Sequence, residues 1–171
     1  MRRAPAGPRN VAHAAAREVS MTLSDSFCVD RYRDEFLELM RSGTFDIVFA
    51  NSHEIKSLYQ TASFEEALAA IRKDCKIAAV TRPEKGSVIV RGDETVILEA
   101  TKIKELVDTT GAGDLYAAGF LYGYTIGHSL KDCGDLGSLA AGLVIQQIGR
   151  ARARICAARP SKRDCYSSKI V

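Results

Sequence analysis

Strand-like runs that alternate with helix-length segments place the strongest constraint on how this chain folds. Phe45–Ala50 is a short apolar run of the kind that buried parallel strands show, and Lys76–Thr81 is the next strand-like run. Val19–Leu23 precedes both. Strands that alternate with helices of roughly 8–20 residues predict an α/β layered domain with a mostly parallel sheet.

The remaining segments complete this pattern. Helices are expected over Val11–Arg17, Asp30–Arg41, Ser52–Gln60, Ser63–Asp74, Ala112–Ile126 and Ser129–Ile148. Ser87–Arg91 and Thr95–Glu99 flank Gly92-Asp93-Glu94, which predicts a short hairpin. Ligands of such sheets bind beyond the carboxyl ends of the strands, where Asn51, Thr81 and the turn before Ala112–Ile126 are expected to meet.

The charge of the chain is unevenly distributed along its 171 residues, a length that predicts one domain. Residues 1–17 hold four Arg and no acidic residue, and residues 150–171 hold seven Lys or Arg against one Asp. Residues 18–149 therefore carry a net charge of −7. Positive charge at the ends alone argues against nucleic acid as a partner. Residues 1–10 and 150–171 are expected to be disordered.

Two further observations limit the class of protein. No apolar run approaches the roughly 20 residues of a membrane-spanning helix, so no membrane partner is expected. The cysteines are odd in number, scattered and without a Cys-x-x-Cys pair: Cys28, Cys75, Cys133, Cys156 and Cys165. This pattern argues against a disulfide or metal framework and favours the reduced thiols of a cytoplasmic protein.

Asp108–Asp114 reads Asp-Thr-Thr-Gly-Ala-Gly-Asp and opens a helix of small residues. The backbone N–H groups of Gly111, Ala112 and Gly113 can turn toward an anion, because no bulky Cβ blocks its approach. The positive end of the helix dipole favours the same anion. A carboxylate at Asp114 is then explained if it takes a proton from a hydroxyl that attacks phosphorus. Gly-Ala-Gly-Asp alone is also typical of an ordinary loop in which Asp114 caps the helix.

The same string, followed by Ala117-Ala118-Gly119-Phe120, resembles the signature of the PfkB/ribokinase family of sugar and nucleoside kinases. The resemblance extends from about residue 11 to Gly149 and corresponds to the C-terminal half of a typical member. It implies ATP- and Mg²⁺-dependent transfer of phosphate to a primary hydroxyl of a nucleoside or sugar, with Asp114 as the catalytic base. Ser20–Arg33 and Thr81–Ser87 look most like bacterial members labelled adenosine kinase.

Asn51 and Glu54 are a candidate magnesium site. They lie three residues apart, on one face of the expected helix, where an amide and a carboxylate can hold the water shell of Mg²⁺. The alternative is a plain capping box. The Asn-x-x-Glu spacing matches the family's magnesium and phosphate motif, so the resemblance implies metal contact through water.

The nucleotide-binding candidates are Thr81, Gly86 and Ala141. Thr81–Ser87 resembles the Thr-x-Gly-x-x-Gly turn with which the family approaches nucleotide phosphates. Thr81 and Gly86 match it, whereas Pro83 stands where glycine is usual and offers no backbone N–H. The small-residue face of the last helix allows close packing of either a helix or an adenine ring. The resemblance places Ala141 in the adenine pocket.

The resemblance also implies what this sequence lacks. Full members resemble a ribokinase-like αβα sandwich with a small β-sheet lid, and their sugar-contacting residues lie mainly in the N-terminal half. A truncated domain over residues 11–149, without the lid, is therefore expected to bind ATP–Mg²⁺ weakly and to turn over little. A nucleotide-binding or interaction fragment without turnover is the alternative. Exposed sheet edges and apolar surface leave homo-oligomerisation open.

Overall fold

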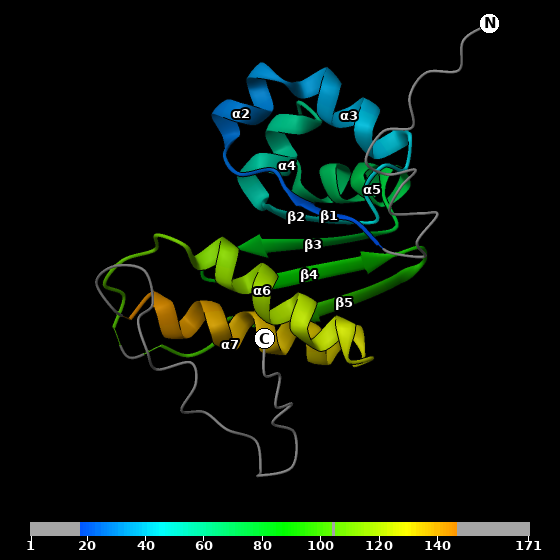
Figure 1. Ribbon diagram of the computed structural model, residues 1–171. Helices are drawn as coiled ribbons and strands as arrows, with labels where there is room; N and C mark the ends of the chain where they lie inside the picture. The colour runs from blue at the N-terminus through cyan, green and yellow to red at the C-terminus, as the bar shows by residue number, and fades with distance from the viewer. Residues whose placement is uncertain (1–17, 104, 147–171) are drawn as a thin grey trace, which may run out of the picture.

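A five-stranded sheet lies at the centre of the computed structural model, which describes residues 18–103 and 105–146 (Figure 1). Its strands follow one another in space as they do in the chain: β1 (Ser20–Thr22), β2 (Ile47–Asn51), β3 (Ile77–Arg82), β4 (Gly86–Arg91) and β5 (Glu94–Leu98). β1, β2 and β3 are parallel, and β4 and β5 are each antiparallel to the preceding strand.

The sheet is therefore mixed: the expected parallel pairing holds for β1, β2 and β3, and it does not hold for the two pairings that β4 makes. The reason is the length of the connections. A parallel pair needs a crossover of a dozen or more residues, which the helical segments supply before β2 and β3. Only three residues join β3 to β4, and only two join β4 to β5, so both pairs must be antiparallel. The expected hairpin around Gly92 is confirmed.

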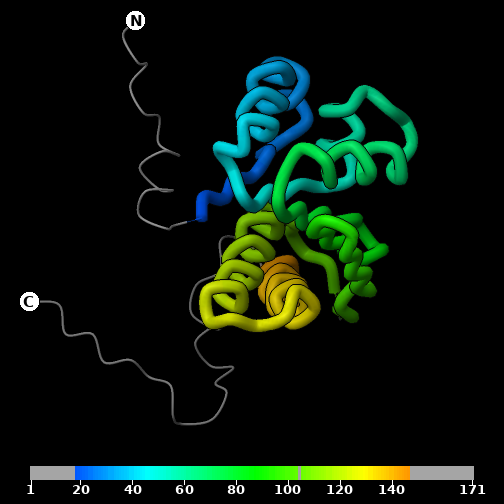
Figure 2. The backbone as a smooth tube through the Cα atoms, turned by 90° about the vertical axis from the view of Figure 1, so that its right-hand side faces the viewer, coloured from blue at the N-terminus to red at the C-terminus, as the bar shows by residue number. Residues whose placement is uncertain are grey.

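Helices cover both faces of the sheet. Those on one face are α2 (Ser26–Arg31), α3 (Arg33–Arg41), α4 (Ser52–Leu58) and α5 (Phe64–Asp74). The opposite face is covered by α6 (Ala112–Thr125) and α7 (Leu130–Val144), which lie side by side (Figures 1 and 2). The expected α/β layering is confirmed.

Each central strand contributes side chains to two separate hydrophobic cores, one on each face of the sheet. Val48 and Ala50 of β2 belong to the cluster under α2–α5, whereas Ile47 and Phe49 belong to the cluster under α6 and α7. β3 shows the same alternation. Because successive residues of a strand point to opposite faces, a strand covered on both sides must be apolar at every position. This explains the continuous apolar run that precedes Asn51.

The single helix predicted over Asp30–Arg41 is replaced by two helices, the first of which begins earlier, at Ser26. Two helices, α2 and α3, meet at Tyr32, whose φ of −121° is not helical. Asp25 caps α2, because its Oδ1 accepts a hydrogen bond of 2.8 Å from the Cys28 amide. The expected helix over Val11–Arg17, the ends at 1–10 and 150–171 and the last residues of Ser129–Ile148 lie outside the described residues.

α6 and α7 approach each other so closely that their backbones touch. A Cβ atom on Gly119 would lie 2.6 Å from the carbonyl oxygen of Leu136, and one on Gly137 would lie 2.7 Å from that of Tyr116. Only glycine fits at either position, because the neighbouring atoms belong to backbone. The small-residue face of α7 therefore serves helix packing at Gly137.

We expect Gly119→Ala to lower the free energy of unfolding by about 1–3 kcal/mol, since the added methyl group meets backbone atoms that cannot rotate away. Helix propensity alone would raise the same quantity by up to about 1 kcal/mol, so the two effects have opposite signs. Urea unfolding followed by circular dichroism measures the change. Ala118→Ser, at the adjoining exposed position, should shift it by less than about 0.5 kcal/mol. A more stable Gly119→Ala variant would contradict the close backbone contact.

Candidate functional site

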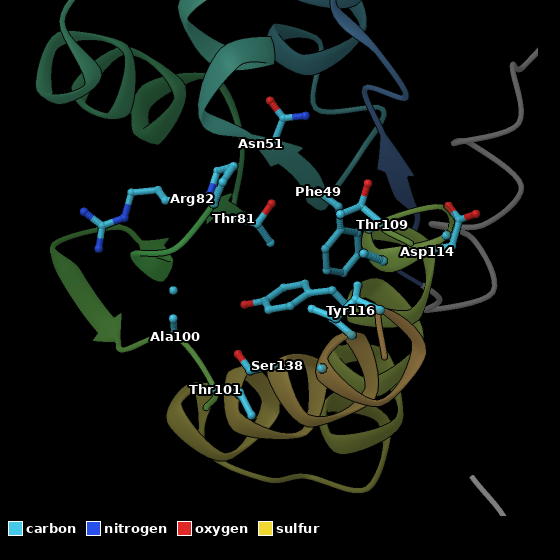
Figure 3. Close-up of a pocket in the computed structure, with 18 of the residues that line it drawn as sticks. Phe49, Asn51, Thr81, Arg82, Ala100, Thr101, Thr109, Asp114, Tyr116 and Ser138 are labelled. Carbon is cyan, nitrogen blue, oxygen red and sulfur yellow. The ribbon is translucent and has the colours of Figure 1, made fainter. Parts of the chain in front are cut away.

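A cavity of about 960 Å³ lies beyond the carboxyl ends of β2 and β3, between the β3–β4 turn, the segment after β5, and the beginning of α6 (Figure 3). All nine candidate site residues line it: Asn51, Glu54, Thr81, Gly86, Gly111, Ala112, Gly113, Asp114 and Ala141. The structure therefore brings together residues that lie between Asn51 and Ala141 in the chain. Their roles remain predictions.

Strand register sets the side of the cavity formed by the sheet. Asn51 pairs with Thr81 in the parallel β2–β3 ladder, and Thr81 pairs with Ser87 in the antiparallel β3–β4 ladder. These three residues therefore form a row across the sheet. The Thr81 hydroxyl donates a hydrogen bond of 3.4 Å to the Ala50 carbonyl, so this hydroxyl is directed toward the neighbouring strand β2.

Asn51 and Glu54 form a complete capping box at the beginning of α4, the alternative left open by the sequence. Asn51 Oδ1 accepts hydrogen bonds from the amides of His53 and Glu54, at 2.8 and 2.9 Å. In return, Glu54 Oε2 accepts one from the Asn51 amide at 2.8 Å, and Glu54 Oε1 accepts one from Asn51 Nδ2 at 2.6 Å. Glu54 is only 5% exposed, and its burial raises the pKa of the carboxyl; the Asn51 hydrogen bond opposes this shift, and nearby Asp25 adds to it.

The capping box is compatible with a hydrated cation. Among the described residues, Glu54 forms no ion pair with Lys or Arg, although its carboxylate borders the cavity. Each carboxylate oxygen has a second lone pair, so Glu54 can accept a hydrogen bond from metal-bound water and keep its bonds to Asn51. Residues 18–103 and 105–146 contain no group of three His, Cys, Asp or Glu side chains placed to hold a metal. A site here would therefore need water and ligand oxygens.

The turn before α6 has the backbone geometry of an anion site. Gly111 precedes the helix at φ 79° and ψ 4°, in the left-handed region that favours glycine. A Cβ atom on Gly111 or Gly113 would meet nothing within 4 Å, so both residues border open space. The amides of Gly113 and Asp114 donate to no acceptor within the described part of the chain, and they lie at the positive end of a 14-residue helix.

One amide of this turn differs from the prediction. The N–H of Ala112, expected to point at an anion, donates a hydrogen bond of 3.1 Å to the carbonyl of Thr109. The amide of Thr110 is likewise engaged, because it donates to Asp108 Oδ1 at 2.9 Å. Of the three amides expected to face an anion, only that of Ala112 is engaged, because those of Gly111 and Gly113 donate to no acceptor among the described residues.

The β3–β4 turn contributes shape to the cavity more than charge. Gly86 has φ 84°, and a Cβ atom there would lie 2.0 Å from the Leu98 carbonyl oxygen, so packing against the end of β5 requires glycine. The Arg82 guanidinium lies 5.3 Å from the ring centroid of Phe64, directed away from Asp114 (Figure 3). Arg82 is therefore placed to stack on α5, and the sequence did not show this.

Two buried hydroxyl groups were missed by the sequence analysis. Tyr116, on the sheet-facing side of α6, donates a hydrogen bond of 2.9 Å to Ser87 Oγ on β4. Ser138 and Thr101 add further hydroxyls to the cavity wall near Ala141. In the sequence, the position of Tyr116 on the apolar side of a predicted helix could have indicated such a bond, because a buried tyrosine hydroxyl usually requires a hydrogen-bond partner. Its partner is distant in sequence and no spacing rule identifies it.

Comparison with known proteins places the chain among kinases. The sequence profile described as pfkB family carbohydrate kinase matches residues 5–154. A nucleoside kinase of Methanocaldococcus jannaschii is 35% identical over 117 residues, which are 68% of this chain and 37% of that protein. Within the described residues, no helix is long and apolar enough to cross a membrane.

Two solved structures are more similar in sequence. A probable sugar kinase from Rhizobium etli is 68% identical, with a TM-score of 0.81, over 82% of this chain and 43% of that one. The adenosine kinase from Sinorhizobium meliloti is 61% identical, with a TM-score of 0.85, over 88% of this chain and 46% of that one. The chain thus spans less than half the length of these relatives.

The raised pKa of Glu54 predicts a pH dependence of stability. The folded protein holds this proton at a higher pH than the unfolded chain does, so the stability contributed by Glu54 falls as pH rises above its ordinary pKa of 4.5 toward the folded-state value. We expect the free energy of unfolding of wild type, relative to Glu54→Gln, to decrease between about pH 4 and pH 7 in urea titrations.

The matched control is Glu66→Gln. Glu66 occupies the same third helical position of α5, where its amide donates to the Ser63 hydroxyl, but its side chain is exposed. The free energy of unfolding of Glu66→Gln should therefore depend on pH in the same way as that of wild type. A wild-type-minus-Glu54→Gln difference that does not vary with pH would show that burial of the Glu54 carboxyl does not shift its pKa.

Proposed function

The chain belongs to the pfkB family of carbohydrate kinases, and we propose that it carries the nucleotide side and the catalytic base of an ATP-dependent kinase that acts on a hydroxyl of a nucleoside or sugar. The observation that supports this most directly is the shared cavity. It joins the open anion turn at Gly111–Gly113, the carboxylate of Asp114 and the row formed by Asn51 and Thr81. A phosphate site beside a carboxylate that forms no ion pair among the described residues suits phosphoryl transfer.

In the proposed reaction, Asp114 accepts the proton of the acceptor hydroxyl. The hydroxyl oxygen then forms a bond to the γ-phosphorus of ATP, the bond from this phosphorus to the β–γ bridging oxygen breaks, and ADP leaves. The free amides of Gly113 and Asp114, together with the dipole of α6, stabilise the charge on the transferred group.

The proposed magnesium contact rests on Asn51 and Glu54. Their oxygens would hold the hydration shell of Mg²⁺, which supplies neutralisation of the triphosphate charge when it is bound. Glu54 would remain the helix cap of Asn51 during this contact, because its capping bonds use only part of its acceptor capacity. A cation near Glu54 would also favour the ionised carboxylate that burial disfavours.

We propose adenosine as the favoured acceptor. The support is the similarity to the Sinorhizobium meliloti adenosine kinase, at 61% identity over 88% of this chain. The second candidate function is nucleotide binding without turnover, because the chain spans 46% of that relative. Turnover by the chain alone is therefore expected to be low.

The test is an assay of ADP release with adenosine, ribose or fructose as acceptor, and with no acceptor as control. It compares the chain alone with the chain joined to the part of the Sinorhizobium meliloti adenosine kinase that it does not cover. We expect acceptor-dependent release from the joined protein, with adenosine preferred. Binding of ATP–Mg²⁺ without release from the joined protein would support the second candidate function instead.

Asp114→Asn in the joined protein should lower kcat by about 10²–10⁴-fold, the usual cost of losing a general base. ATP affinity, measured by calorimetry, should stay within a few-fold, because removing a negative charge near the phosphates does not weaken their binding. Asp93→Asn, in the exposed β4–β5 turn, is the control for removal of an aspartate charge and should retain activity. Unchanged turnover in Asp114→Asn would exclude the assigned base.

Gly113→Val should reduce ATP affinity itself, because a branched side chain would fill the open space through which a phosphate reaches the amides. The protein has no atom within 4 Å of the added Cβ position, so the substitution should cost little more than helix propensity in stability. Ala118→Val, at an exposed position of the same helix, is the control for that propensity. Calorimetry that shows equal ATP affinity in both variants would contradict the phosphate-binding turn.

A further inference from the structure

We infer that Tyr116 is a positioning residue, which holds the first turn of α6, and with it Asp114, in a fixed relation to the nucleotide side of the cavity. It acts through the hydrogen bond of 2.9 Å that its hydroxyl donates to Ser87 Oγ. The kinetic consequence of this inference rests on the proposed function. Its structural part, the fixed position of the helix turn, does not.

Both partners are withdrawn from solvent. Tyr116 is 3% exposed, and Ser87, at 1%, is one of two polar or charged residues that are buried in the described part of the chain, the other being Glu54. Burial raises the pKa of Tyr116 to about 12, although the bond to Ser87 opposes the shift. The tyrosine hydroxyl therefore keeps its proton at physiological pH and remains the donor.

The beginning of α6 has few other attachments to the sheet. Gly111 provides no side-chain cap, and the amides of Val107 and Asp108 donate to the carbonyl of Ile145, the residue after α7, at 2.8 and 3.2 Å. Those bonds tie the preceding segment to the end of α7, and the next ring of α6 on the sheet is Phe120, which packs on Phe49 of β2 one turn after Tyr116. Tyr116 is the first residue of α6 that is buried, and its hydroxyl reaches a strand.

The hydrogen bond of Tyr116 ends on β4, the strand that pairs with Thr81 of the proposed nucleotide site. Ser87 pairs with Thr81, and Thr81 pairs with Asn51, so the hydrogen bond ends on the same row of residues. The Tyr116 ring crosses the cavity with its hydroxyl directed away from Asp114 (Figure 3). One side chain therefore spans the distance between the catalytic turn and the nucleotide-binding row.

Gly137 has no side chain, and this allows α7 to pack against the Tyr116 ring and to restrict its orientation. A Cβ atom on Gly137 would lie 3.1 and 3.2 Å from Cδ2 and Cε2 of Tyr116, so α7 packs directly against the ring edge. A hydrogen bond between two buried hydroxyls adds little net stability, since both groups lose bonds to water on folding. Its larger effect is to select one orientation of the ring and of the helix turn that carries it.

The first experiment uses hydrogen exchange, which does not require activity. In Tyr116→Phe, the amides of residues 115–118 should exchange about tenfold faster, because the first helical turn is no longer held to β4. Exchange in β2 and β3 should not change. Tyr122→Phe removes the same atom from the same helix, but Tyr122 is 58% exposed, so its exchange pattern should match wild type. Equal exchange in Tyr116→Phe and wild type would overturn the inference.

The second experiment separates positioning from stability. Tyr116→Phe and Ser87→Ala each leave one buried hydroxyl without a partner and should lower stability, whereas the double variant leaves none and should recover it. In the joined protein, kcat should fall about tenfold in Tyr116→Phe and should stay low in the double variant, with KM for ATP within twofold. Recovery of kcat together with stability would assign the pair a structural role only.

The two experiments also distinguish this inference from the proposed function. A joined protein without acceptor-dependent turnover contradicts the proposed kinase activity, and the hydrogen-exchange result then still decides whether Tyr116 holds the turn of α6. Faster exchange in Tyr116→Phe with kcat equal to wild type would show that the turn is held but that its position does not matter for transfer, which would overturn the kinetic part of the inference.

Discussion

The parallel pairing of β2 with β3 is the constraint on which the rest of this structure depends. It places Ala50 beside Val80 and Asn51 beside Thr81, so that the last apolar residues of both strands are covered by helices and the first polar ones emerge at one edge. A shift of one residue would turn every side chain of β2 to the opposite face and mix the two cores. Core packing and site assembly are therefore set by the same register.

The positive groups that can face a phosphate in the cavity are mostly backbone amides, and only one of the described groups is a basic side chain. Arg82 is the only Lys or Arg among the described residues that line the cavity, and its guanidinium is placed against Phe64. Three carboxylates, Glu54, Glu84 and Asp114, border the same space. Amides of the α6 turn can bind a phosphate, but they do not neutralise a triphosphate beside three carboxylates, which is why the proposal includes a divalent cation.

Sequence reasoning was most successful where local chemistry decides the outcome. Strand ends at Asn51 and Thr81 could be predicted because an apolar run that stops at a polar residue marks both the covered part of a strand and the edge where ligands bind. The mixed sheet was missed although its hairpin was predicted, because the short β3–β4 connection was not used to orient β4. The hydrogen bond of Tyr116 to Ser87 depends on how α6 crosses the sheet, and no local rule contains that angle.

The glycine contacts between α6 and α7 also determine where the domain can bend. Because backbone meets backbone at Gly119 and Gly137, a sliding or tilting movement of one helix against the other would bring backbone atoms into collision, so we expect the two helices to move together. Asp114 belongs to one of these helices, and Ala141 belongs to the other. A change in the width of the cavity would therefore require this pair to move relative to the sheet, to which Tyr116 is joined by its hydrogen bond to Ser87.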